Sequence, residues 1–208
     1  PEPGYKRTYQ QHLHQAHLLR AFRSLGARVV ALEPQPDLVR VLQGLYGRDR
    51  DVVIMPLAVG RAPGTARLHV AERNPTVSTL SAAWRSRVQQ DPSFGRVAWS
   101  EGCAVAVTTL DALIAAHGEP AFVKIDVEGY EGEVLAGLSR PVAALSFEYV
   151  LPAIDLAFAC LDRLEALGDY AYNVSPGETR RLMFREWIDA PAMRRLLHDR
   201  PRGGGSGD

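Results

Sequence analysis

Short apolar runs alternate with stretches of helical spacing along most of this chain. The runs are rich in β-branched residues and predict buried strands at 28–32, 51–60, 103–107, 121–125 and 141–150. The stretches between them repeat apolar residues every three or four positions and predict helices at 11–25, 36–46, 110–117, 133–136 and 155–167. This alternation predicts an α/β fold with a doubly wound, mainly parallel sheet.

The end of the chain departs from this alternation. Residues 170–174 and 179–184 predict an antiparallel pair at the C-terminal edge of the sheet, joined by a turn that contains proline and glycine. The glycine-rich stretch 202–208 has little to pack and predicts a disordered tail. A chain of 208 residues without an internal repeat suits one domain, which we assign to residues 1–201.

Charge and cysteine content narrow the class of protein. Equal numbers of basic and acidic residues, 24 each, give no electrostatic reason to expect nucleic acid or a membrane surface as partner. No apolar run approaches the ~20 residues that a membrane helix needs. Cys103 and Cys160 lie in apolar surroundings without the spacing of metal ligands, which favours thiols in a reducing compartment. We therefore expect a cytoplasmic protein.

An acidic turn follows the fourth predicted strand. Asp126, Glu128 and Glu131 lie within six positions, immediately before a helix. The carboxyl ends of strands line the ligand crevice of an open α/β sheet, so we expect Asp126 and Glu128 at its rim. Lys124 and Asp126 lie in or at the end of an apolar strand, where an unpaired charge is costly. For Glu131 and Glu133, a favourable interaction with the helix N-terminus is an equally good explanation.

Two further acids follow predicted strands. Glu33 comes between the first strand and a helix, an arrangement that binds a nucleoside ribose because a carboxylate accepts from two vicinal hydroxyls. A glutamate in a surface turn would give the same pattern. Glu148 lies near the end of a later strand, at the same predicted rim. The small residues around Ala58 and Val59 leave room for a flat ring such as adenine.

A polar loop over 72–80 is rich in hydroxyls, and the segment 81–102 carries three large aromatic residues. Together they look like an insertion over the crevice. Such a loop suits a substrate lid, and a simple connector is the alternative.

Several motifs in order resemble the FkbM family, S-adenosylmethionine-dependent methyltransferases that mostly methylate hydroxyls of natural products and sugars. The specific motif is Lys124-Ile125-Asp126-Val127-Glu128-Gly129, and weaker ones stand at 30–34, 57–60, 109–111 and 134–137. The resemblance runs from about Ala21 to Tyr149 and implies a Rossmann-like class I methyltransferase sheet.

The resemblance implies site residues by position. Glu33 resembles the acid that holds the cofactor ribose, Ala58 and Val59 would lie near adenine, and Asp126 would lie near the sulfonium. The cofactor-binding set is then Glu33, Pro34, Gln35, Leu57, Ala58, Val59 and Asp126. The substrate-binding set, which includes the serine-rich segment, is Thr76, Ser78, Thr79 and Tyr149.

One part of the family pattern is missing. A first strand and a glycine-rich turn should precede the helix that leads to Arg28, yet no glycine occurs between Gly4 and Gly26. Glycine allows the backbone to approach a cofactor closely. Either the chain has lost this loop near 5–16, or a stretch is absent from the sequence there. The intact downstream motifs favour the second explanation.

The hypothesis is an O-methyltransferase that uses S-adenosylmethionine and acts on a hydroxyl of a small-molecule natural product or sugar. The catalytic candidates are Lys124, Asp126, Glu128 and Glu148. Carboxylates facing one crevice raise one another's pKa toward a useful base, and Lys124 opposes that shift. If a metal such as Mg²⁺ is used, its ligands would be Asp126, Glu128 and Glu148. The alternatives are an NAD-dependent oxidoreductase on a similar sheet, which has no use for the acidic turn, and a non-catalytic methyltransferase-like binding protein.

Overall fold

The computed structural model describes residues 15–71, 74–92, 94, 97–100, 102–179, 181–200 and 205–208. A helix occupies residues 15–24, as the apolar spacing predicts. The position expected for the missing strand and glycine-rich loop, near 5–16, falls largely outside the described residues.

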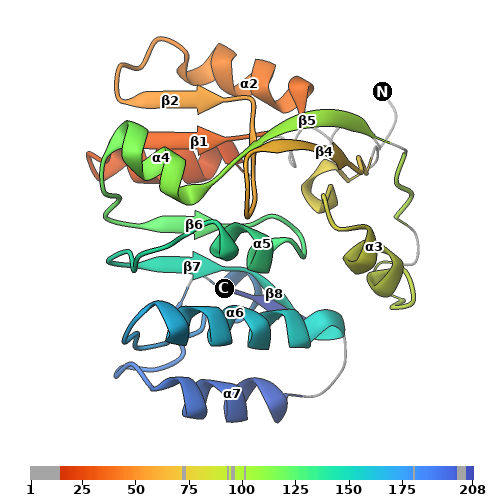
Figure 1. Ribbon diagram of the computed structural model, residues 1–208, viewed down its shortest axis with the longest axis vertical. Helices are drawn as coiled ribbons and strands as arrows, with labels where there is room; N and C mark the ends of the chain where they lie inside the picture. Colours follow the sequence, from red (N-terminus) through yellow and green to blue (C-terminus); the bar gives the residue numbers. More distant parts are fainter. Residues whose placement is uncertain are drawn as a thin grey trace.

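Two parallel strand pairs make up the centre of the molecule. β1 (Val29–Leu32) pairs with β2 (Val52–Met55), and β6 (Val123–Ile125) pairs with β7 (Leu145–Phe147). Figure 1 shows the four arrows pointing the same way, in the spatial order β2, β1, β6, β7. No ladder joins β1 to β6 within the described residues, so the sheet is divided where one doubly wound sheet was expected. The fold is therefore mixed α/β with small sheets.

A third sheet carries the chain away from the parallel strands. β5 (Cys103–Thr108) pairs in parallel with β3 (Ala58–Val59) and antiparallel with β4 (Gly64–Leu68). Figure 1 shows β4 and β5 extending toward the side where the arrowheads of the parallel strands point. This sheet positions the described residues 74–92 and 97–100, which connect β4 to β5, at the carboxyl ends of those strands.

The predicted antiparallel strand pair over 170–184 is wrong for the described residues of this segment, whose two stretches share only one backbone–backbone bond, from the Met183 N–H to the carbonyl of Val174. In its place Tyr172 forms an isolated antiparallel bridge with Ile188, and Gly177–Thr179 forms a short 3-10 helix. The side chain of Asn173 explains the difference, because its amide donates to the carbonyl of Phe184 and accepts from the Phe184 N–H. These side-chain bonds replace the backbone bonds of a regular ladder.

The chain end is ordered. β9 (Ser206–Gly207) pairs antiparallel with β8 (Tyr149–Val150), and the backbones of Ser175 and Asp208 exchange hydrogen bonds of 2.8 and 3.1 Å. The prediction of a disordered tail is therefore wrong for residues 205–208, and residues 202–204 lie outside the described residues. Backbone pairing on both sides compensates for the lack of apolar side chains in this segment.

The helices follow the sequence pattern closely except at 82–88, inside the segment 81–102 for which no helix was predicted. They are α2 (Pro36–Tyr46), α3 (Ala82–Val88), α4 (Leu110–His117), α5 (Glu131–Ala136), α6 (Ile154–Leu167) and α7 (Ala190–His198), with 3-10 turns at Pro75–Val77 and Leu151–Ala153. Thr109 and Asp189 cap α4 and α7 through their side chains, as their residue types favour. Within the described residues, no helix combines the length and apolarity required to cross a membrane.

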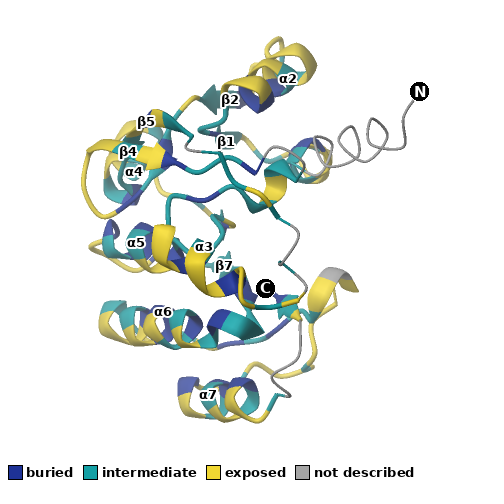
Figure 2. Cartoon of the chain, turned by 90° about the vertical axis from the view of Figure 1, so that its right-hand side faces the viewer, coloured by how far each residue is buried: buried dark blue, intermediate teal, exposed yellow. Residues whose placement is uncertain are grey.

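The apolar core lies in two main parts. The larger one packs α5, α6 and α7 against β6 and β8, and a smaller one packs the helix at 15–24 and α2 against β2. In Figure 2, α6 and α7 each carry buried and exposed residues along their length, as helices packed on one side do. Cys160 is buried in the larger core, Cys103 is half-buried, and both are free thiols.

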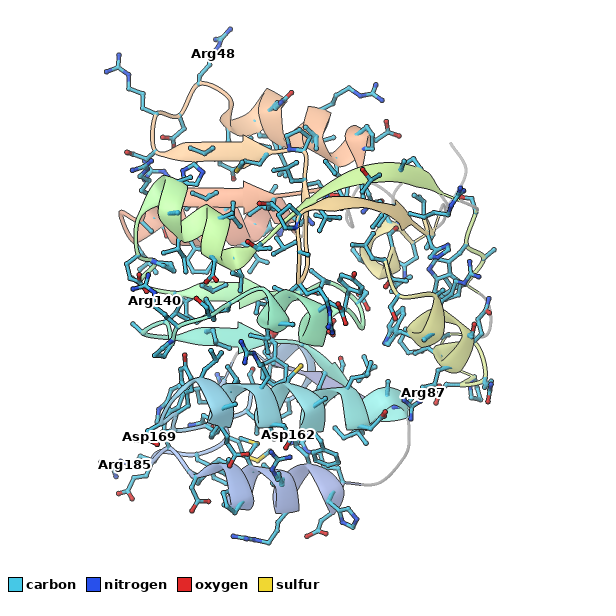
Figure 3. The ribbon with its side chains drawn as sticks, in the orientation of Figure 1. Arg48, Arg87, Arg140, Asp162, Asp169 and Arg185 are labelled. Atoms are coloured by element: carbon cyan, nitrogen blue, oxygen red, sulfur yellow. The ribbon has the colours of Figure 1, made fainter. Side chains whose placement is uncertain are left out.

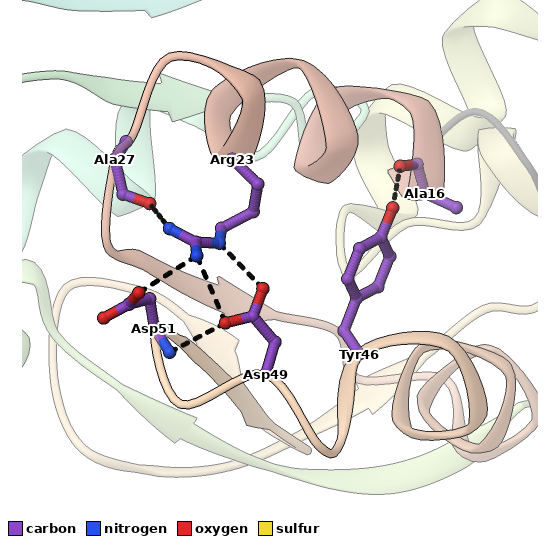
Figure 4. A network of polar contacts seen from close by, with 6 residues as sticks. All are labelled: Ala16, Arg23, Ala27, Tyr46, Asp49 and Asp51. Atoms are coloured by element: carbon purple, nitrogen blue, oxygen red, sulfur yellow. Dashed lines mark hydrogen bonds and ion pairs between the residues drawn. The ribbon is translucent and has the colours of Figure 1, made fainter.

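Polar contacts fix the first helix to the β1–β2 pair (Figure 4). Arg23 donates to the Asp49 carboxylate at 2.8 Å, to Asp51 at 3.0 Å and to the carbonyl of Ala27 at 2.7 Å. Tyr46 at the end of α2 donates to the carbonyl of Ala16 at 2.7 Å. The Arg23 bonds lie at the amino ends of β1 and β2, opposite the edge at which the candidate site begins.

Candidate active site

A cavity of about 110 Å³ lies at the carboxyl ends of β1 and β6. All seven residues expected to bind a cofactor line it: Glu33, Pro34, Gln35, Leu57, Ala58, Val59 and Asp126. Three of the four expected substrate contacts, Thr76, Ser78 and Thr79, line it too, as does Glu128. The sequence analysis did not assign Gln15, Leu32, Leu38, Leu68, Pro75, Leu80 and Val127, which complete the lining. Parallel strands explain this convergence, because their carboxyl ends meet at one edge.

Glu33 forms the floor of this cavity and is 1% exposed. Its backbone N–H donates to the carbonyl of Met55, which extends the β1–β2 pairing and fixes where the side chain begins. One carboxylate oxygen accepts from the N–H of Gln35 at 2.7 Å. Burial raises the pKa of Glu33, and the bond from Gln35 partly opposes that rise. Side-chain hydrogen bonds from Gln15 and Gln35 also oppose the rise, so a ligand hydroxyl would compete with these two side chains for the carboxylate.

The loop over 74–80 closes one side of the cavity through hydrogen bonds. Ser78 donates to the side-chain oxygen of Gln35 at 3.2 Å, and Gln35 donates to the carbonyl of Pro75 at 3.2 Å. Thr76 donates to Asn74 at 2.8 Å. The hydroxyls of Thr76 and Ser78 thus have hydrogen-bond partners within the protein. These bonds stabilise the conformation of the loop, in addition to any contact with a ligand.

The catalytic candidates form one cluster. The carboxylates of Asp126, Glu128 and Glu148 each offer an oxygen within 4.8 Å of the others. The parallel β6–β7 register brings Glu148 to this edge, where its N–H donates to the carbonyl of Ile125 at 3.1 Å. The ammonium group of Lys124 lies 3.5 Å from Asp126. The structure therefore brings together all four residues that the sequence proposed.

A fifth charged group joins this cluster. The Asp208 carboxylate forms an ion pair and a hydrogen bond with Lys124. The sequence of a glycine-rich tail does not predict this contact. The contact depends on the pairing of β9 with β8, because that pairing places Asp208 near Lys124. Burial alone would lower the pKa of Lys124, but the charges of Asp126, Asp208 and Glu148 outweigh it and raise that pKa.

Two carboxyls of the cluster hold protons more tightly than usual. Burial, and then the charges of Glu148 and Asp126, raise the pKa of Glu128 well above its ordinary value. Burial and the charge of Asp126 raise the pKa of Glu148 to about 8, and Lys124 opposes this shift. The direction is the one expected from the sequence. Groups with such pKa values can exchange a proton with a hydroxyl near neutral pH.

A second, smaller hollow adjoins the cluster. It measures about 10 Å³, room for about one water, and Glu128, Glu148, Tyr149 and Trp84 are among its walls. Glu128 lines both this hollow and the larger cavity. Tyr149, an expected substrate contact, faces the hollow, and its hydroxyl accepts from Arg200 at 2.8 Å.

The sequence from residue 10 to residue 185 matches the sequence model of the methyltransferase FkbM domain. The chain belongs to the FkbM methyltransferase family. No curated protein and no solved structure gives a significant match.

Membership in the FkbM family confirms the resemblance seen in the short motifs and supports a methyltransferase in general. The mixed α/β fold with small sheets is consistent with a methyltransferase-like fold. The family match favours a methyltransferase over the oxidoreductase alternative.

Proposed function

We propose that this FkbM methyltransferase transfers a methyl group from S-adenosylmethionine to a hydroxyl of a small molecule, such as a natural product or a sugar. The observation that carries the proposal is that Glu33 and Asp126 line the same cavity, with Glu128 beside them. A nucleoside held by Glu33 would then have its far end next to the carboxyl cluster.

The described residues fit the nucleoside part of this cofactor. Glu33 supplies a buried carboxylate for the ribose hydroxyls, and Ala58 and Val59 leave space for a flat ring. The cavity of about 110 Å³ is smaller than the roughly 300–1,000 Å³ of a complete small-molecule site. The glycine-rich turn expected to hold the amino acid end would fall near residues 5–16, largely outside the described residues. Asp126 is the described residue proposed for that end.

The bound cofactor supplies a methyl group activated on a sulfonium. The protein must then align the acceptor oxygen with that methyl group, and such positioning can supply several kcal/mol. We assign the acceptor's proton to a carboxylate oxygen of Glu128, which lines both the large cavity and the hollow. Glu148 keeps the pKa of Glu128 high enough for this step, since its charge is among the causes of the raised pKa. A general base of this kind contributes about 10²–10⁴-fold in rate.

Lys124 and Asp126 complete the proposed machinery. The ammonium group of Lys124 limits the repulsion among the carboxylates, because it lies 3.5 Å from Asp126. The same trio of Asp126, Glu128 and Glu148 has the oxygen ligands that Mg²⁺ prefers. A metal there would acidify the acceptor hydroxyl, and we treat it as an optional part of the proposal.

The test is incubation with labelled S-adenosylmethionine and a panel of hydroxylated metabolites, followed by mass spectrometry. We expect methylated product with the wild-type chain, and a loss of about 10²-fold or more in turnover for Glu128→Gln. Asp126→Asn should also lose turnover. The matched control is Glu119→Gln, an exposed carboxyl beside Arg140, which Figure 3 shows at the other end of the strands.

Three outcomes contradict parts of this proposal. Undiminished turnover in both Asp126→Asn and Glu128→Gln would remove these residues from the chemistry. Calorimetry with S-adenosylhomocysteine that shows no binding would favour the non-catalytic binding protein. Binding without product from any acceptor would limit the conclusion to the cofactor.

A further inference from the structure

The turn that carries Glu128 has an unfavourable backbone. Glu128 has a φ of 54° and is the one non-glycine residue with positive φ among the described residues. Gly129 follows with a φ of 82°. A left-handed backbone conformation costs a glutamate free energy, so it persists only where contacts with the rest of the protein stabilise it.

The first contact that holds the turn comes from Glu131, the first residue of α5. Glu131 is 4% exposed, and one oxygen of its carboxylate accepts from the N–H of Val127 at 3.3 Å and from the N–H of Gly129 at 3.1 Å. These two N–H groups flank Glu128 in the chain. An oxygen with two lone pairs can accept both bonds at once. Glu131 therefore fixes the backbone on both sides of Glu128.

The second hold comes from the loop before α3. Thr79 is 1% exposed, and its hydroxyl donates to the carbonyl oxygen of Glu128 at 2.6 Å. The same hydroxyl accepts from the N–H of Ser81 at 2.9 Å. Ser81 in turn caps α3, because its side chain accepts from the N–H of Trp84 at 3.0 Å. A continuous series of hydrogen bonds thus joins α3 to Glu128.

The third hold is steric. The indole ring of Trp84 lies against the Cα of Gly129, so closely that a side chain there would overlap the ring. Trp84 is 2% exposed and packs edge-on against Phe94 and Trp99. Arg87, labelled in Figure 3, forms a 2.7 Å ion pair with Asp155 that joins α3 to α6. The ring is therefore fixed against the turn.

We propose that Thr79, Trp84 and Glu131 are positioning residues that hold the Glu128 carboxylate between the large cavity and the hollow. This inference rests on the proposed function, in which Glu128 accepts the acceptor's proton. It changes the role expected for Thr79, whose hydroxyl is already occupied as donor and as acceptor, from substrate contact to support of the base. On this proposal, the connection from residue 74 to residue 88 holds the turn that carries Glu128, and does not serve only to cover the crevice.

The test compares Thr79→Val, which has the shape of threonine but no hydroxyl, with Thr79→Ser, which keeps the hydroxyl. We expect Thr79→Val to lower kcat by about 10-fold with little change in KM, while Thr79→Ser stays within about 2-fold. The acidic limb of the pH–rate profile should move toward the ordinary pKa of a carboxyl in Thr79→Val. Binding of S-adenosylhomocysteine should stay within about 2-fold in both variants.

A second measurement does not depend on turnover. Amide hydrogen exchange at Val127 and Gly129 should rise by about 10-fold or more in Glu131→Met, which removes the acceptor oxygen, and in Thr79→Val, and stay near wild type in Thr79→Ser. If the wild-type chain methylates nothing, the proposed function fails while this exchange result still tests the positioning role. Unchanged exchange in both variants would overturn the inference. So would a Thr79→Val variant with normal kcat and pH profile, or one whose loss lies wholly in cofactor binding.

Discussion

Gly129 and the indole ring of Trp84 are in direct contact across the turn that carries Glu128. Gly129→Ala would place a methyl group inside the ring and would force a non-glycine residue to keep a φ of 82°. We expect a loss of about 2 kcal/mol or more in the free energy of unfolding, measured by chemical denaturation.

The matched control for that substitution is Gly132→Ala, three positions later in α5. A Cβ at Gly132 meets nothing within 4 Å, and alanine favours a helix over glycine by up to about 1 kcal/mol. The control should therefore keep or raise the stability. Equal stability of Gly129→Ala and wild type would mean that Trp84 does not confine the turn.

Glu33→Gln should weaken binding of S-adenosylhomocysteine. An amide offers only one acceptor oxygen and no charge, and hydrogen bonds to charged groups contribute about 1.5–3 kcal/mol. We expect the Kd to rise by roughly 10- to 100-fold in calorimetry. Glu165→Gln, which pairs with Arg194 on the surface of α6, should bind as wild type does. A normal Kd in Glu33→Gln would exclude the ribose role.

Glu131 makes the stability depend on pH. Burial raises the pKa of its carboxyl from 4.5 to about 7, so between these values the folded state keeps a proton that the unfolded state releases. Its contribution is complete below about pH 4.5 and is lost as the pH rises through 7. The free energy of unfolding should fall by on the order of 3 kcal/mol over this range because of this group.

Glu131→Gln tests that dependence, since an amide does not titrate. Denaturation curves at about pH 5 and about pH 8 should differ less in this variant than in wild type. Glu128 and Glu148 have raised pKa values and contribute with the same sign, so part of the slope will remain. A variant with the full wild-type slope would show that Glu131 ionises normally.

Turnover should rise as the pH rises above the ordinary range of a carboxyl, because burial and neighbouring charges raise the pKa of Glu128, which must lose its proton before it can accept another. The charge of Glu148 is one cause of the raised pKa of Glu128. Glu148→Gln removes that charge, so the acidic limb of the pH–rate profile should move to lower pH. An unmoved limb would separate Glu148 from the proton transfer.

Removal of divalent metal should leave turnover within about 2-fold, because Lys124 already places a positive charge 3.5 Å from Asp126. The measurement is methyl transfer before and after dialysis against a chelator. Loss of turnover that Mg²⁺ restores would instead assign Asp126, Glu128 and Glu148 as its ligands.

The sequence by itself determined the local elements and the edge on which the site lies. Thr109 and Asp189 cap the helices that their residue types predict, because a cap needs only neighbours in the chain. Glu33 and Asp126 reach one cavity because each follows a parallel strand, and parallel strands end at the same edge. Periodicity and strand order are sufficient for such statements.

Only the tertiary structure decided how these residues are held. The bond from Thr79 to Glu128, the ion pair of Asp208 with Lys124, and the packing of Trp84 on Gly129 join segments that are far apart in the chain. The separation of β1 from β6 likewise depends on tertiary packing, because the sequence pattern does not specify which strands pair with each other. Local pattern records which face of an element is apolar, but contacts between distant segments depend on the packing of the whole chain.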